Sequence, residues 1–113
     1  MQNIPDSPDA ARLAAELNNY RVARGRGDAA AAWRSLERAH ILSQPRLLPH
    51  LRVHVEMLTF AVAERDPWEV TGQLARLLLA PLGTITGRIP VGNTGRSNVS
   101  AVKPMPLPDD LRP

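Results

Sequence analysis

The chain contains no cysteine among its 113 residues, and this absence removes three classes of chemistry at once. Without thiols there is no disulfide, no thiolate metal site and no thiol nucleophile. Aromatic residues are also scarce, at 4%, while hydrophobic residues reach an ordinary 43%. Because Ala and Leu must then fill the core, we expect close-packed helices and not a sheet rich in β-branched and aromatic residues. The length allows one domain with a modest core.

Long apolar runs are missing as well. The longest one late in the helical part, LARLLLAPL, is broken by Arg76 and Pro81 and is too short to cross a bilayer. The N-terminal segment MQNIPDSPDAARLAAE has no basic region followed by an apolar region, as an export signal would have. These absences predict a cytoplasmic protein that makes no contact with a membrane.

Charge is present but is not concentrated in one place. The formal net charge is +3, the basic residues are almost all Arg, and Lys103 is the only Lys. A basic balance permits binding to nucleic acid. The Arg residues are scattered, however, without a recognition module and with little aromatic interleaving, so we expect no nucleic-acid partner.

Apolar spacings of three and four residues, together with capping signals, predict four helices. Their expected ranges are Ser7–Arg24, Asp28–Leu42, Leu47–Glu64 and Pro67–Ala80. The expected buried faces comprise Leu13, Leu17 and Tyr20; Ala29, Ala32, Trp33, Leu36 and His40; Leu51, Val55, Leu58 and Val62; and Val70, Leu74, Leu77 and Leu78.

The strongest local signal is the start of the fourth helix. Asp66 is expected to cap it, with Pro67 at the first helical position and the side chain of Glu69 reaching back from the third. Pro81 and Gly83 are expected to end this helix.

Short connections predict that consecutive helices lie antiparallel. The strings ARGRGDAAAAWRSLERAHIL and VAERDPWEVTGQLARLLL share a tight turn, an Asp cap and similar apolar spacing. Their separation is near the period of helical-hairpin repeats. The predicted fold is therefore all-α, with four antiparallel helices in two tetratricopeptide-like hairpins.

The residues after the fourth helix lose this periodicity and are rich in Pro and Gly. Composition alone favours a disordered tail. The alternative, which we favour, is a helical domain at residues 1–83 and an extended strap at residues 84–113 that packs on it. Apolar residues spaced along the tail support the strap; they are Ile85, Ile89, Val91, Val99, Val102, Met105 and Leu107.

Three strings in order along the chain are similar to a known family: AWRSLERAHILSQP, PHLRVHVEML and GRIPVGNTGRSNVSAVKPMPLPDDL. They resemble the short bacterial proteins catalogued as domain of unknown function 3703. The resemblance covers nearly the whole chain and implies a small helical, cytoplasmic, bacterial protein. It implies no activity.

All three histidines fall within fifteen residues. Glu37 and His40 are three apart on the second predicted helix, and His50 and His54 are four apart on the third, so each pair shares a face. The short turn between the helices is expected to bring the four side chains together as ligands of Zn, Fe, Co or Ni. The alternative is a hydrogen-bonded polar cluster that serves packing. Met57 would add a thioether ligand or belong to the core.

The string Gly92-Asn93-Thr94-Gly95-Arg96 also has two interpretations. Its backbone donors and guanidinium suit an anion-binding nest. It suits equally a turn that needs positive φ.

Two functional hypotheses of different classes follow. The first is a non-enzymatic interaction or regulatory module that engages a protein partner or a second copy of the chain, since no catalytic set of residues is complete. The second is a divalent-metal-binding protein built on the His and Glu cluster. Metal content after purification without an affinity tag distinguishes them.

Overall fold

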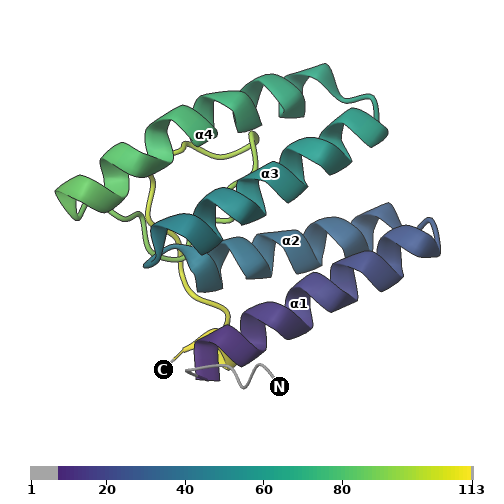
Figure 1. The fold of residues 1–113 in the computed structure, drawn as a ribbon, viewed down its shortest axis with the longest axis horizontal. Coiled ribbons are helices and arrows are strands. Elements are labelled where there is room, and N and C mark those ends of the chain that lie inside the picture. The colour runs from purple at the N-terminus through teal and green to yellow at the C-terminus, as the bar shows by residue number, and fades with distance from the viewer. Residues whose placement is uncertain (1–7, 113) are drawn as a thin grey trace.

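The computed structural model describes residues 8–112, which contain four α-helices and one short 3-10 helix. The α-helices are α1 (Pro8–Gly25), α2 (Ala29–Ser43), α3 (Leu47–Ala63) and α4 (Pro67–Thr86), and η1 (Asp109–Leu111) follows near the C-terminus. No strand occurs within residues 8–112. Each helix packs beside the next one along the chain (Figure 1). The prediction of an all-α protein with four helices is confirmed.

Side-chain caps begin two of the helices where the sequence predicts them. Asp28 accepts a hydrogen bond from the backbone N–H of Ala31 at 3.1 Å. Asp66 accepts one from the backbone N–H of Glu69, also at 3.1 Å. These bonds satisfy amide groups that have no partner inside the first turn. Ser7, the predicted cap of α1, lies outside the described residues.

The predicted end of α4 is wrong. The helix continues through Pro81 and Gly83 to Thr86. A proline removes only one hydrogen bond of the ladder, and a helix can retain it where the surrounding turns remain bonded. Beyond Pro81, Thr86 donates from Oγ1 to the carbonyl of Leu82 at 2.7 Å. The helix ends before Gly87, whose φ of 72° suits glycine.

Nine buried side chains from α1, α2 and α3 form the apolar core: Leu17, Tyr20, Ala23, Ala32, Leu36, Ala39, Val53, Met57 and Phe60. The ring of Phe60 contacts Tyr20 edge-on at a centroid distance of 5.7 Å and Trp33 at 5.0 Å. The predicted faces of the first two helices therefore point inward. Met57 belongs to this core.

The predicted faces of the last two helices are wrong. Val55 and Val62 of α3 are exposed, and Leu78 of α4 is 78% exposed. The buried positions of α4 include Glu69 and Gln73. On α3 the apolar residues that point inward are Val53, Met57 and Phe60, which lie on a different side of the helix from the expected ones. On α4 polar side chains are buried because Glu69 and Gln73 bond polar groups of residues 95–97.

Residues 87–112 run along the helices and return to α1 (Figure 1). Gln44 donates to the carbonyl of Pro90 at 3.0 Å, and Arg38 pairs with both Glu16 and Asp110. Ile85 and Val102, which we expected to pack, are instead 78% and 76% exposed. None of the described helices combines the length and apolarity that a membrane span needs.

Candidate metal centre

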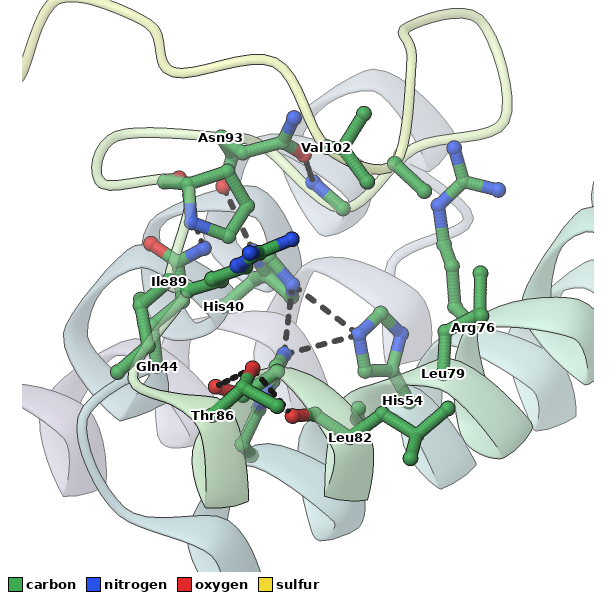
Figure 2. Close-up of a pocket in the computed structure, with 17 residues that line it drawn as sticks. His40, Gln44, His54, Arg76, Leu79, Leu82, Thr86, Ile89, Asn93 and Val102 are labelled. Atoms are coloured by element: carbon green, nitrogen blue, oxygen red, sulfur yellow. Dashed lines mark hydrogen bonds between the residues drawn. The ribbon is translucent and has the colours of Figure 1, made fainter.

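The three histidines converge between α2 and α3. His40 lies in the last turn of α2, and His50 and His54 lie one turn apart on α3. Their Nε2 atoms form a triangle with edges of 3.0 Å (His40 to His50), 3.1 Å (His40 to His54) and 3.1 Å (His50 to His54) (Figure 2). All three side chains are buried. We refer to the three Nε2 atoms as the histidine triangle.

The other ring nitrogen of two histidines has a hydrogen-bond acceptor. His40 Nδ1 lies 2.6 Å from the carbonyl oxygen of Asn93, which can only accept. His40 therefore carries its hydrogen on Nδ1. His50 Nδ1 is buried and has no hydrogen-bond partner.

His54 Nδ1 lies 2.7 Å from Oε1 of Gln73. The Gln73 amide is oriented by its NH₂ group, which donates to Glu69 at 3.0 Å and to the carbonyl of Gly95 at 2.8 Å. Because both of those partners accept, Oε1 must face His54, and His54 also carries its hydrogen on Nδ1.

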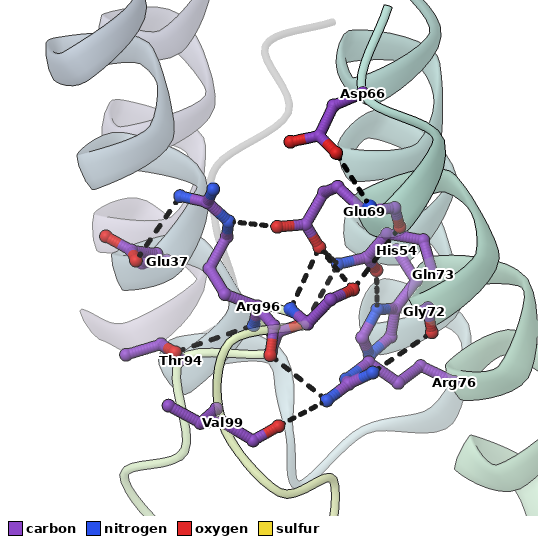
Figure 3. A network of polar contacts seen from close by, with 12 residues as sticks. Glu37, His54, Asp66, Glu69, Gly72, Gln73, Arg76, Thr94, Arg96 and Val99 are labelled. Atoms are coloured by element: carbon purple, nitrogen blue, oxygen red, sulfur yellow. Dashed lines mark hydrogen bonds and ion pairs between the residues drawn. The ribbon is translucent and has the colours of Figure 1, made fainter.

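Glu69 anchors this outer layer (Figure 3). Its carboxylate accepts from Arg96 Nε, from the backbone N–H of Ser97 at 2.9 Å, from the Ser97 hydroxyl at 2.7 Å, and from Gln73. Burial alone would raise the pKa of Glu69, but these hydrogen bonds hold it below its usual range. The predicted role of Glu69 in reaching back to the start of α4 is therefore replaced by contacts with the tail.

The string from Gly92 to Arg96 forms the loop that closes over His40. Gly92 and Gly95 both have φ of 80°, which is the geometry that the turn hypothesis requires. Asn93 Oδ1 accepts from the N–H of Gly95 at 2.9 Å, and Asn93 Nδ2 donates to the carbonyls of Ser100 and Lys103. A Cβ atom on Gly95 would lie 2.5–2.8 Å from three atoms of the His40 ring. Thr94 accepts weakly from the N–H of Arg96 at 3.5 Å.

Glu37, the fourth predicted ligand, lies outside the histidine cluster. Its carboxylate faces the guanidinium of Arg96 at 3.8 Å. Arg96 also bonds Glu69 and lies 3.8 Å above the ring of Trp33. Among the described residues, the side chains that lie close enough together to share one ion are His40, His50 and His54.

Burial keeps the histidines neutral. It lowers the pKa of His40 well below its usual range, assisted by the neighbouring His54 and His50. It lowers the pKa of His50 to about 4, with His54 assisting. The pKa of His54 also falls, mainly through burial, while its bond to Gln73 opposes the change. At neutral pH the Nε2 atoms of the triangle can therefore act as metal ligands.

The triangle lies at the wall of a cavity of about 340 Å³ between α4 and the tail (Figure 2). Leu79 and Leu82 of α4 line it, as do Ile89 and Val102 of the tail. Three imidazoles beside an open space resemble the ligand arrangement of catalytic zinc sites, which keep one coordination position for water or substrate.

Three residues of the centre were missed at the level of sequence. Gln73 and Glu69 carry the outer hydrogen bonds, and Arg76 donates to the carbonyls of Gly72, Arg96 and Val99. The signal that could have revealed them is their spacing, since they occupy one face of α4 at intervals of four and three residues.

Comparison with known proteins identifies the family of the chain but gives no activity for it. The chain belongs to the family described as protein of unknown function (DUF3703), whose model matches residues 9–113. No curated protein and no solved structure matches the chain significantly.

Proposed function

We propose that this member of the DUF3703 family binds one divalent transition-metal ion between the Nε2 atoms of His40, His50 and His54. The observation that carries the proposal is the histidine triangle itself, with edges of 3.0–3.1 Å at a buried position.

Counting hydrogens shows why the triangle favours a cation. A neutral imidazole has one N–H, and in His40 and His54 that hydrogen is on Nδ1. Their Nε2 atoms therefore present lone pairs to each other at 3.1 Å. His50 can supply only one further hydrogen, so at least one edge remains a contact between lone pairs. A metal ion converts all three lone pairs into bonds.

The size of the triangle also fits an ion. Its edges of 3.0–3.1 Å put each nitrogen about 1.8 Å from its centre, so one ion with nitrogen–zinc bonds of about 2.0–2.1 Å could reach all three. A fourth position then remains on the far side of the ion from the three nitrogens. Three protein ligands with one open position are the ligand count of catalytic zinc sites.

The outer hydrogen bonds support the same conclusion. Histidine ligands of metals usually donate their second N–H to a carbonyl or a polar side chain, which fixes the ring. His40 donates in this way to Asn93, and His54 donates to Gln73, which Glu69 holds in turn. Three imidazoles without sulfur suit Zn, Co, Ni or Fe(II) and do not suit Cu(I).

The organisation of the chain follows from this site. We propose that the chain after α4 acts as a strap on the helices, because Asn93 and Gly95 supply carbonyls that fix the site. The strap begins at Gly87 and not at the predicted boundary of residue 84, because α4 continues to Thr86. Two further points stay predictions. They are the antiparallel, tetratricopeptide-like pairing of the helices and the bacterial, cytoplasmic setting of the protein.

The interaction-module hypothesis also retains one supporting observation. Large apolar side chains are exposed along α4, among them Trp68, Leu74, Leu78 and Leu82. Exposed apolar surface of this kind is common where a partner or a second copy binds. Sedimentation measured across micromolar concentrations tests self-association, and a monomer throughout would count against the second copy.

Thermal unfolding with Zn, Co, Ni or Fe(II) tests the metal site. Ligand at a thousand times its Kd stabilises the folded state by about 4 kcal/mol, so the melting temperature of the wild type should rise by more than about 10 °C. In His54→Ala the rise should disappear, because one of only three protein ligands is lost.

Glu37→Gln is the matched control. Its carboxylate was a predicted ligand but faces Arg96, so the variant should keep the response to metal. Equal responses in wild type and His54→Ala, or no response to any of the four metals, would leave the histidines as a packing cluster.

A further inference from the structure

The cavity beside the histidine triangle has an apolar wall and a positive character. Seventeen of the described residues line it, and none of these is Asp or Glu (Figure 2). Leu79, Leu82, Ile89 and Val102 supply the apolar surface. Its volume of about 340 Å³ lies within the range of pockets that hold small molecules.

Two arginines, Arg76 and Arg88, also line this cavity. Arg76 stands beside the ring of His54 (Figures 2 and 3). Its terminal nitrogens donate only to backbone carbonyls, and its Nε is buried without a hydrogen-bond partner. Glu69, the acidic group nearest in the network, is already bonded by Arg96 and Ser97. Among the described residues no carboxylate forms an ion pair with Arg76, and the charge of Glu69, which acts on Arg76, is shared with Arg96.

A bound divalent ion would add to this imbalance. Three neutral imidazoles cancel none of its charge, so the ion and Arg76 together place several positive charges at one end of a cavity that has no acidic residue. An ion pair inside such low-polarity surroundings is strong when its partner charge is present and costly when that charge is missing.

We infer that the cavity binds a small monocarboxylate with an apolar body, its carboxylate at the fourth position of the metal and near Arg76, and its hydrocarbon against Leu79, Leu82 and Val102. This inference rests on the proposed metal site. On binding, a carboxylate oxygen displaces a water molecule from the ion, and no covalent bond of the ligand breaks.

The experiment uses the full chain loaded with Co²⁺, whose visible absorption reports its coordination. Co²⁺ uptake is measured first, by titration. Octanoate, acetate and 1-octanol are then added separately, and affinities are measured by calorimetry. We expect octanoate to change the cobalt spectrum and to bind at least about tenfold more tightly than acetate. Burial of only two of the methylenes that acetate lacks already accounts for about that factor. The same margin is expected over 1-octanol, which lacks the charge.

A pair of α4 variants locates the ligand. Leu82 lines the cavity and is 59% exposed, so Leu82→Glu places a repelling carboxylate there with little risk to folding. Leu78 is also exposed on the same helix, at 78%, but does not line the cavity, so Leu78→Glu is the matched control. We expect Leu82→Glu to weaken octanoate binding at least about tenfold while Co²⁺ still binds, and Leu78→Glu to leave both unchanged.

The outcomes separate the two proposals. Failure of Co²⁺ to bind overturns both of them. Co²⁺ binding with no preference for octanoate over acetate or over 1-octanol overturns the carboxylate inference and leaves the metal site standing. Equal octanoate binding by Leu82→Glu and Leu78→Glu also overturns it, because the ligand would then lie elsewhere.

Discussion

The apolar core and the histidine centre are two interiors built on opposite principles. In the core, side chains such as Leu17, Leu36 and Phe60 are removed from water and need no specific partner. Around the histidine triangle, Gln73 and Glu69 are just as buried but are polar, and each must find its hydrogen bonds. A buried polar network contributes to stability only when its members are satisfied.

The difference shows where a ligand is needed. The apolar core is complete with the residues that form it. In the histidine centre, the described polar groups that lack a suitable hydrogen-bond partner are the Nε2 atoms of the triangle, His50 Nδ1 and Arg76 Nε. These groups gather around one cavity, which is lined by all four residues that carry them: His40, His50, His54 and Arg76. We therefore expect ligands to change the stability of the second region and to leave the energetics of the first untouched.

The largest effect should come from Leu36→Ala in the apolar core. Leu36 is completely buried, and removing such a side chain costs about 2–5 kcal/mol. Urea unfolding should show the same loss with a chelator present and with saturating zinc, because the two sites contribute independently. If the loss of unfolding free energy were markedly smaller in zinc, the apolar core and the histidine centre would not be independent.

Gly95→Ala should have the next largest effect, and it should act on the second region alone. The φ of 80° disfavours any side chain, and the added Cβ would lie 2.5 Å from Cδ2 of His40. The loop or the ring must therefore move. We expect a stability loss of about 2–3 kcal/mol, with a fall in zinc affinity of at least about tenfold.

Gly27→Ala is its control. Gly27 has a similar φ of 73° but no atom within 4 Å of an added Cβ. It therefore shares the backbone cost of about 1 kcal/mol and none of the collision. Calorimetric zinc titration should show normal affinity for Gly27→Ala. Equal zinc affinity in the two variants would mean that the loop does not position His40.

The same contrast explains what could be predicted from the sequence. On α1 and α2 the buried residues are apolar, so spacing alone located Leu17, Tyr20 and Leu36. The convergence of His40, His50 and His54 was also predictable, since it requires only a shared helix face and a short turn.

On α3 spacing selected the wrong apolar face, since Val53, Met57 and Phe60 are buried while Val55 and Val62 are exposed. On α4 it failed because it assumes that apolar residues point inward. Leu78 points outward and Gln73 inward, since Gln73 must bond the carbonyl of Gly95, 22 residues later. Glu37 was predicted as a ligand because it precedes His40 by one turn. Its actual partner, Arg96, comes from the tail, and a contact across that distance leaves no local pattern.

The smallest effect is a pH dependence of the metal-free protein, which we expect to arise in the histidine centre. A histidine in the unfolded chain takes up a proton below about pH 6.5, whereas burial lowers the pKa of His50 in the folded chain to about 4. Between these values the unfolded state binds more protons, so the free energy of unfolding should fall as the pH falls, by up to about 1.4 kcal/mol per pH unit for one histidine. His40 and His54 act in the same direction, while burial raises the pKa of Glu37 and gives a contribution of opposite sign.

Urea unfolding at pH 7, 6 and 5 in a chelator should therefore give a shallower pH dependence of the unfolding free energy for His50→Gln than for the wild type, since the carboxylates are common to both. Leu36→Ala should keep the slope of the wild type, because the apolar core contains no titrating group that it changes. A His50→Gln slope as steep as that of the wild type would show that His50 is not held neutral by its burial, and the distinction between the two interiors would lose its electrostatic basis.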